Sequence, residues 1–368
     1  MARIDTGKKE LALVALVTVL ALMLRFFRLG HQSLWIDEIL TLGASDPPPP
    51  GIPFAVKLLW DVHGPLYTLV VHVWRTVSET DAWLRVPGAV AGVATVPLLY
   101  AWLKREVGRD AALTGALFMA LSPFNIYYSQ EVRFYALLTM MTVVSLIAYR
   151  LFVDRPSPRN ATLLGIALGL ACLSHLMALF LCAGFAMHLL TTRRARGPHL
   201  RWGILAAAIA LVIVSPWIYR QLFFLQRIQE TEPSARAIIY RMEEGRFPPL
   251  LSYPYAVYAF ATGFSFGPDL RELRASLSTG ALMKRYALEI GVATVVFGAA
   301  LIGGIARLRR QRRLALFVSI PAATIVLVTL AAALKIKVFN ARYLTPAFPV
   351  FIAVLACGAV RRLSLIHI

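Results

Sequence analysis

The sequence has few acidic residues, few charges of either sign and few cysteines. Asp and Glu number 19 against 38 Lys and Arg, and charged residues make up 15% of the 368 residues. The three cysteines, Cys172, Cys182 and Cys357, lie in apolar stretches without metal-ligand spacing. We therefore interpret them as small buried hydrophobic residues, not as a redox centre or as zinc ligands.

The scarcity of charge excludes a soluble protein of several domains. Hydrophobic residues make up 58% of the chain and the mean hydropathy is +0.67, which is typical of a polytopic membrane protein. The net charge of +19 would suit nucleic-acid binding only if the basic residues formed one face of a soluble domain. Here they separate apolar segments, so no nucleic-acid partner is predicted.

Long apolar stretches predict the transmembrane helices. A spanning helix needs about 20 mostly apolar residues, and stretches of suitable length are residues 11–27, 84–103, 111–127, 134–153, 203–219, 286–306, 314–333 and 344–360. Residues 161–190 are too long for one helix, and Ser174 and His175 near their middle predict a helical pair. The predicted fold is one all-α polytopic membrane domain over residues 1–368, with about ten transmembrane helices.

Basic residues in alternate connections predict the orientation. Lys and Arg outnumber acidic residues in the stretches at residues 3–9, 104–109, 150–159, 193–201, 307–313 and 361–362. Short basic connections of this kind face the cytoplasm. The alternation is unbroken only if residues 161–190 cross twice, which supports the helical pair. We therefore predict a multi-pass protein of the inner (cytoplasmic) membrane, surrounded by membrane lipids, whose other face looks to the periplasm or exterior.

Two longer loops fall on the predicted external side. The first, residues 29–83, contains the run Pro47–Pro50, which cannot form regular helix. Apolar segments at residues 54–60 and 66–74 are too short to span and predict helices that lie in the membrane interface. The second loop, residues 220–285, is rich in Pro, Tyr and Phe and is predicted to form a lid.

The most unusual polar feature is the acidic pair Asp37 and Glu38, just beyond the first apolar stretch and beside Trp35 and Ile36. An ionised group near hydrocarbon is costly unless it is paired or functional. Residues from several distant segments share the predicted external side with this pair: His63, Gln130, Glu131, Arg133, His175, Lys335, Lys337, Arg342 and Tyr343.

Each of these residues also has a simpler explanation. The acidic pair could cap a helix, Glu131 and Arg133 could form a local ion pair, and either histidine could be satisfied within a turn. Arg342 could be a snorkelling anchor at the interface. Independent features of this kind need not share a face, so their coincidence favours a functional site.

Four segments, taken in order, resemble the C-type glycosyltransferase superfamily of membrane enzymes, in particular its protein O-mannosyltransferase and aminoarabinose transferase branch. These segments are residues 35–38 (WIDE), 61–67 (DVHGPLY), 122–137 (SPFNIYYSQEVRFYAL) and 339–346 (FNARYLTP). The resemblance covers nearly the whole chain. It departs at Gly64, where relatives often carry the first of two consecutive prolines. The chain also ends soon after the last predicted span, as a fragment or a short member would.

The resemblance implies transfer of a hexosyl or pentosyl group from a polyprenyl-phosphate carrier to a protein, lipid or polysaccharide acceptor. By its place in the motif, Asp37 is the predicted catalytic base and Glu38 orients the acceptor. The phosphate leaving group calls for cations, and Arg342 is the first choice because its planar fork can grip a phosphate, before Arg133, Lys335 and Lys337. The predicted pocket residues are His63, Gln130, Glu131, Tyr343 and His175.

Two questions stay open at the level of sequence. A divalent metal ion could assist, held by Asp37, His63 or Glu131, but no compact metal motif is present and no cofactor is certain. The alternative function is a polytopic transporter or lipid flippase without transferase activity. That class commonly places ionisable residues in mid-span and has paired halves with broken helices, and a non-catalytic scaffold is a third reading.

Overall fold

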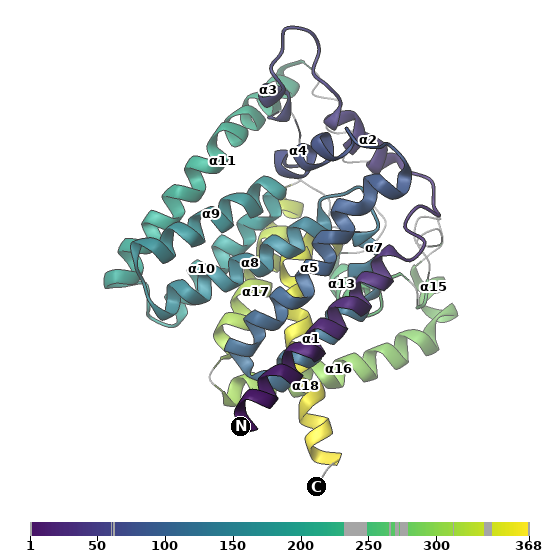
Figure 1. Ribbon diagram of the computed structural model, residues 1–368, viewed down its shortest axis with the longest axis vertical. Coiled ribbons are helices and arrows are strands. Elements are labelled where there is room, and N and C mark those ends of the chain that lie inside the picture. Colours follow the sequence, from purple (N-terminus) through teal and green to yellow (C-terminus); the bar gives the residue numbers. More distant parts are fainter. Residues whose placement is uncertain are drawn as a thin grey trace.

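The computed structural model describes residues 2–59, 61, 63–231, 249–264, 266–268, 272, 279–311, 313–334 and 341–366. All regular structure in these residues is helical, which confirms the predicted all-α fold. Helices cross the molecule from its lower end, where both termini lie, toward an upper end formed by α2 (Ile36–Ser45), α3 (Phe54–Leu58) and α4 (Pro65–Trp74) (Figure 1).

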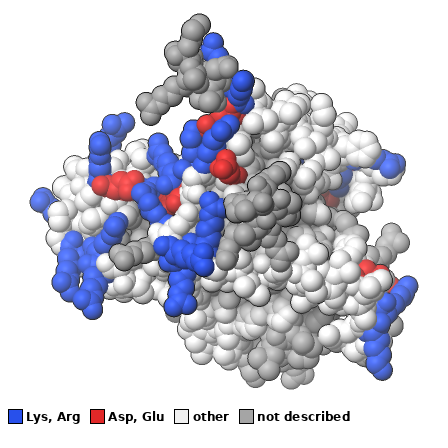
Figure 2. Space-filling model, turned by 90° about the horizontal axis from the view of Figure 1, so that it is seen from below, with Lys and Arg blue, Asp and Glu red and all other residues white. Residues whose placement is uncertain are grey.

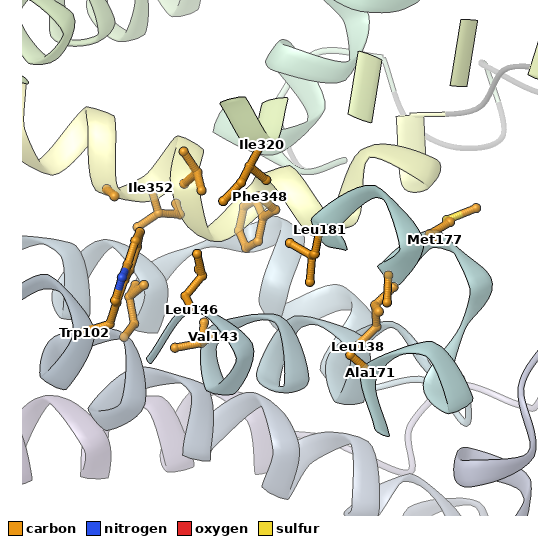
Figure 3. Close-up of a cluster of buried hydrophobic side chains, with 14 of the residues drawn as sticks. Trp102, Leu138, Val143, Leu146, Ala171, Met177, Leu181, Ile320, Phe348 and Ile352 are labelled. Atoms are coloured by element: carbon orange, nitrogen blue, oxygen red, sulfur yellow. The ribbon is translucent and has the colours of Figure 1, made fainter. Parts of the chain in front are cut away.

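The centre of the molecule is a bundle of closely packed helices. Its members are α1 (Ala2–Phe26), α5 (Asp81–Val107), α6 (Arg109–Leu121), α8 (Tyr135–Asp154) and α18 (Phe348–Ile366). Figure 3 shows the packing: Trp102 of α5 and Leu146 of α8 point toward Phe348 and Ile352 of α18. All four side chains are buried, so the C-terminal helix is held in the middle of the bundle.

The helical pair predicted within residues 161–190 is confirmed. α9 (Pro158–Ser174) and α10 (Leu179–Thr191) are joined by the short 3-10 helix η1 (Leu176–Ala178). His175 lies in extended backbone at the break, and its Nδ1 accepts a hydrogen bond from the backbone N–H of Met177 at 3.1 Å. The imidazole thus caps η1 and ends α9 at the predicted turn.

The remaining long helices lie around this bundle. They are α11 (Gly197–Thr231), α16 (Ala287–Arg310) and α17 (Leu314–Ala333). Within the described residues, six helices are long and apolar enough to cross a membrane: α5, α8, α11, α16, α17 and α18. The predicted count of about ten therefore stays a prediction, although helices also occupy the other predicted spans.

The first long loop contains the short helices predicted for it. α3 and α4 fall on the two segments assigned to the membrane interface, and α4 begins with Pro65 in its first turn, where proline costs no hydrogen bond. The described part of the second loop contains the end of α11, α13 (Pro249–Thr262) and α15 (Thr279–Arg285), with turns and bends at residues 263–268 where these are described. Residues 232–248, 265, 269–271 and 273–278 of the predicted lid lie outside the described residues, and its role as a lid stays a prediction.

Helix α16 approaches α18 through glycine. A Cβ on Gly304 would lie 2.0 Å from the carbonyl oxygen of Val354, and one on Gly358 would lie 1.9 Å from that of Ala300. Such close backbone approach is typical of helix pairs in membranes, where small residues replace the missing hydrophobic drive. Only 11% of the apolar window of α16 is buried, so this contact is a large part of what holds the helix.

We expect Gly304→Ala to loosen α16 and to lower the thermal unfolding temperature in detergent. The matched control is Gly298→Ala in the same helix, where an added Cβ meets nothing within 4 Å. Alanine is the better helix former by up to about 1 kcal/mol, so the control should be neutral or stabilising. Equal unfolding temperatures for the two variants would contradict the close packing of α16 on α18.

Candidate active site

The acidic pair lies in the first turn of α2, and its two carboxylates point in different directions. Successive residues of a helix are about 100° apart, so only one of the pair can face the protein. Glu38 is the inward residue, with a side chain 0% exposed, whereas the side chain of Asp37 is 23% exposed. The two neighbours in sequence therefore have different surroundings.

Glu38 is held by hydrogen bonds on both of its carboxylate oxygens. Arg85 of α5 donates from Nε to Oε1 at 3.0 Å and from Nη2 to Oε2 at 2.9 Å. The backbone N–H groups of Val132 and Trp35 donate to Oε1 at 2.8 Å and to Oε2 at 3.1 Å. A carboxylate has about four acceptor positions, and here all four are used by the protein.

Asp37 faces a cation from the opposite end of the chain. Arg342, in the 3-10 helix η2 (Ala341–Ala347), places Nη1 3.3 Å from Oδ2 of Asp37. Its guanidinium also lies 6.0 Å from the ring centre of Tyr135 and 5.8 Å from that of Tyr343. Both charged groups remain part-exposed, so a ligand can reach either of them.

Arg133 supports the backbone of α2. Its Nη1 donates to the carbonyl oxygen of Asp37 at 3.0 Å and to Oγ1 of Thr41 at 2.9 Å. The residue is only 3% exposed, and its guanidinium lies 5.0 Å from the ring centre of Phe134. This geometry positions the first turn of α2 rather than presenting a free cation to solvent.

Glu131 is a third carboxylate close to the pair, and it is buried. Tyr67 of α4 lies against its backbone, with the hydroxyl 3.5 Å from the carbonyl oxygen. Burial raises the pKa of Glu131 to about 8, with a smaller contribution from the charge of Glu38. A hydrogen bond with Tyr127 and the charges of the nearby arginines oppose this shift. The side chain is therefore mainly neutral at pH 7.

The two predicted histidines form a cluster of three rings with Phe134. The ring of Phe134 is 4.3 Å from that of His175 and 5.6 Å from that of His63, and the two imidazoles are 6.2 Å apart. The backbone N–H of His63 donates to Oδ1 of Asp61 at 2.8 Å. Burial raises the pKa of Asp61, but hydrogen bonds with His63 and Thr68 lower it overall.

Gly64 explains the departure of this chain from the double-proline pattern. Its φ is +139° and an added Cβ would lie 2.5 Å from the carbonyl oxygen of Leu173 and 2.6 Å from that of Ser174. A proline ring requires a negative φ, and any side chain would clash with the end of α9. Glycine here lets the backbone beside His63 pack directly on the turn that carries His175.

The other predicted site residues have different surroundings. The side-chain amide of Gln130 donates to the carbonyl oxygens of Arg25 and Phe27 at 3.1 and 2.9 Å, so it satisfies the C-terminal end of α1. Tyr343 is buried beside Arg342. Lys335 and Lys337 lie outside the described residues.

The predicted metal ligands do not form a compact set. Among the described residues, no group of three or more His, Cys, Asp or Glu side chains is arranged to hold a metal ion. Asp37 instead contacts Arg342, and His63 contacts Asp61 at 3.7 Å. The residues present therefore do not fit a metal held jointly by Asp37, His63 and Glu131 in this conformation.

Sequence reasoning missed Arg85, the partner of Glu38. The residue lies at the start of an apolar stretch, and only its position inside a predicted span distinguishes it from the many basic residues at helix ends. Besides Glu38, it donates to the backbone oxygens of Leu29 and Gln32 at 3.1 and 2.7 Å. Nothing in the sequence spacing pairs residue 85 with residue 38.

The arrangement joins one accessible carboxylate to one accessible guanidinium on a frame of buried polar contacts. A carboxylate within reach of a substrate hydroxyl can take its proton, and a guanidinium can hold a phosphate oxygen. The rings of Tyr135 and Tyr343 lie about 6 Å from the guanidinium of Arg342. The site has the parts needed to transfer a group away from a phosphate.

Comparison of the sequence with protein families and curated proteins identifies relatives. The sequence model of the Dolichyl-phosphate-mannose-protein mannosyltransferase family matches residues 62–219. Residues 62–219 of the chain are thus similar to this mannosyltransferase family. A lipid A galacturonosyltransferase, RgtD of Rhizobium johnstonii, is 29% identical over 158 residues, which are 41% of this chain and 32% of the relative. The predicted superfamily resemblance is confirmed.

Solved structures share the fold. ArnT from Cupriavidus metallidurans, bound to undecaprenyl phosphate, matches with a TM-score of 0.60 and 17% identity over 95% of this chain and 60% of ArnT. The oligosaccharyltransferase of Archaeoglobus fulgidus matches with a TM-score of 0.55 and 12% identity, over 96% of this chain and 49% of that protein. The chain thus spans at most about 60% of the length of these relatives.

We expect Glu38→Gln to destabilise the protein strongly, because it leaves the buried charge of Arg85 without a counter-charge. Removing one partner of a buried ion pair costs roughly 3–5 kcal/mol, which thermal unfolding in detergent would detect as a large decrease. The matched control is Glu79→Gln, which breaks an exposed pair with Arg75 and should change little. Similar unfolding temperatures for the two variants would contradict the burial of Glu38.

The raised pKa of Glu131 makes part of the stability depend on pH. The folded protein keeps a proton that the unfolded chain releases near the ordinary value of 4.5. The stabilising contribution is therefore full below about pH 4.5 and is lost as the pH rises through about 8. Between pH 5 and 9, the unfolding temperature should fall more in the wild type than in Glu131→Gln. The variant Glu79→Gln should keep the wild-type profile, and a Glu131→Gln profile parallel to the wild type would refute the shift.

Proposed function

We propose that this protein transfers a sugar from a polyprenyl-phosphate carrier to an acceptor hydroxyl or amine by a single, inverting displacement. The observation that carries the proposal is the contact between Asp37 and Arg342 at 3.3 Å, with both groups part-exposed. One group can accept a proton and the other can hold a phosphate, and the relatives that match the chain are glycosyltransferases. The bound lipid of ArnT, undecaprenyl phosphate, suggests the carrier class.

Asp37 is the proposed general base. As the acceptor oxygen or nitrogen forms a bond to the anomeric carbon, its proton passes to the Asp37 carboxylate, and the bond from that carbon to the phosphate oxygen breaks. The bonding electrons leave with the carrier phosphate. One displacement of this kind inverts the anomeric configuration, in contrast to the double displacement through a covalent intermediate.

Arg342 is the proposed group that stabilises the leaving phosphate. In the structure its Nη1 contacts Asp37, and donor binding would replace that contact with a phosphate oxygen and release the carboxylate to face the acceptor. Arg133 lies behind the site and holds the backbone of Asp37, so its proposed contribution is mainly positioning and electrostatic. Lys335 and Lys337 remain secondary proposals for the phosphate.

The other site residues receive supporting roles in this proposal. Glu38 positions Asp37, because its carboxylate is saturated by Arg85 and two backbone N–H groups and does not reach an acceptor. Glu131, neutral at pH 7, can donate a hydrogen bond to a sugar hydroxyl. His63, with a side chain 46% exposed, is the proposed wall of the donor or acceptor pocket together with His175 and Tyr343.

The proposed topology has ten transmembrane helices. Six satisfy length and composition criteria among the described residues, and α1, α6, α9 and α10 occupy the other predicted spans. The alternating basic connections favour an orientation with the acidic pair at the external face of the inner membrane. A donor on a lipid carrier suits that side, because soluble nucleotide sugars are made in the cytoplasm.

The proposal names the sugar and the acceptor only by their chemical class. Hexosyl and pentosyl donors both fit the chemistry, and the acceptor is a protein, a lipid or a polysaccharide. The matched galacturonosyltransferase acts on lipid A by its name, which favours testing a glycolipid acceptor first. The chain covers only part of each relative. Functions of the parts that it does not cover are therefore not assigned to this protein.

The mechanism proposed here takes no step through a metal. The candidate ligands do not converge among the described residues, and Arg342 supplies the positive charge beside Asp37. Transfer measured with and without a chelator tests the separate proposal of a divalent ion. The transporter or flippase alternative is less favoured, because the charged residues of the described helices lie toward the helix ends rather than in mid-span.

We expect Asp37→Asn to lower transfer by about 100-fold or more, the usual contribution of a general base. Membranes containing the wild type or a variant would be supplied with labelled polyprenyl-phosphate sugars and a glycolipid fraction, and labelled acceptor would be counted. The matched control is Asp46→Asn, which changes an acid whose side chain is 52% exposed at the other end of α2 and should leave transfer unchanged.

Two results would overturn the proposal. Unchanged transfer by Asp37→Asn, in a protein that unfolds at the wild-type temperature, would remove the base assignment. Consumption of no donor by the wild type would favour the transporter or flippase reading, which an assay of labelled lipid crossing proteoliposome membranes would then examine.

A further inference from the structure

A polar cavity lies at the end of the bundle opposite the acidic pair. Its volume is about 350 Å³, within the range of small-ligand pockets. Its walls come from the ends of α5, α8 and α10 and from the start of α17. The ionisable lining residues are Glu106, Tyr149, Arg150, His188, Arg194 and Arg313. Figure 2, seen from below, shows Lys and Arg gathered over one part of this end.

Positive charge exceeds negative charge around this cavity. Glu106 meets Arg150 at 3.2 Å and Arg313 at 3.5 Å, and Arg150 also contacts Asp154 at 2.9 Å. Among the residues that the structure describes, no acid pairs with Arg194 at the cavity edge. Three guanidinium groups therefore face two carboxylates, which leaves the cavity ready for an anion.

The position of Arg194 is set by the backbone after α10. Arg193 has a left-handed conformation, with φ of 55°, and the backbone N–H of Arg194 donates to the carbonyl oxygen of Leu189 at 2.8 Å. The turn thus directs the chain back over the end of its own helix. Arg194 is held at the edge of the cavity while its side chain stays exposed.

Glu106, which lines the cavity, has one carboxylate oxygen that accepts no hydrogen bond from the described residues. Glu106 is only 5% exposed, and its Oε2 takes both arginine contacts. Within the described part of the chain, its Oε1 is buried without a hydrogen-bond partner. A buried unsatisfied acceptor costs free energy, and a ligand carrying a hydroxyl donor would satisfy it.

We propose that this cavity binds a phosphate ester that also carries a hydroxyl group, such as the phosphoglycerol headgroup of an anionic lipid. The phosphate would lie against Arg194 and Arg313 at the edge, and the hydroxyl would donate to Oε1 of Glu106. Neither group belongs to the proposed transfer site at the other end of the molecule. The combination distinguishes this ligand from a phosphate without a donor and from a choline headgroup, which brings a cation and no donor.

The test measures lipid binding by the purified full chain in detergent with native mass spectrometry. Phosphatidylglycerol, phosphatidic acid and phosphatidylcholine would be titrated into the wild type and into Arg194→Gln. The matched control is Arg159→Gln, which removes the same charge from an exposed position near this end that does not line the cavity. Neither substitution breaks an ion pair that the described residues form.

We expect the wild type to prefer phosphatidylglycerol over phosphatidic acid, and phosphatidic acid over phosphatidylcholine. Arg194→Gln should weaken phosphatidylglycerol binding about fivefold, the usual effect of one basic residue near an anionic headgroup, and Arg159→Gln should not. Equal binding of the three lipids, or equal effects of the two substitutions, would overturn the proposal.

A competition arm identifies the source of the phosphate ester. Displacement of phosphatidylglycerol by millimolar glycerol phosphate, but not by inorganic phosphate, would support the site with a soluble ligand. Binding of the lipid form alone would support the site with a membrane ligand. Displacement by inorganic phosphate as effectively as by glycerol phosphate would refute the role assigned to Glu106. Sugar transfer is not part of this readout, so failure here leaves the proposed function untouched.

Discussion

The buried ion pair between Glu38 and Arg85 is the contact on which the upper end of the molecule depends. Arg85 rises from α5 and reaches the carboxylate with two hydrogen bonds, and it also donates to backbone oxygens between α1 and α2. The backbone N–H of Val132 completes the set from the turn before α8. Three parts of the chain thus meet at one carboxylate. Burying a carboxylate costs free energy unless it is paired and hydrogen-bonded, and these partners supply both.

From this contact the different surroundings of the nearby acids follow. Because Glu38 points inward, helical geometry turns Asp37 outward, toward Arg342. Glu131 is buried as well, and this burial raises its pKa to about 8. Three neighbouring carboxyl groups thus differ: Glu38 is fully hydrogen-bonded, Asp37 is accessible, and Glu131 is mainly neutral and can donate a hydrogen bond. Different surroundings of this kind let neighbouring acids perform different tasks.

The two ends of the bundle differ in the burial and the charge balance of their polar groups. At the upper end, the carboxylate of Glu38 is buried and fully hydrogen-bonded, and the rings of Phe134 and Tyr135 lie beside Arg133. At the lower end, arginines lie near the surface in excess over acids. The first pattern suits a site that must exclude water and hold geometry, and the second suits attraction of anions from outside.

The sequence by itself determined the all-helical fold, the helical pair broken at His175 and the short helices of the first loop, because hydrophobic length and turn residues act locally. It also pointed to Asp37 and Arg342, through motifs near opposite ends of the chain. Only the tertiary structure decided that Glu38 pairs with Arg85, that Gln130 satisfies the end of α1, and that Gly64 packs on the turn carrying His175. Such contacts join residues from different helices, and spacing along the sequence carries no information about which helices pack together.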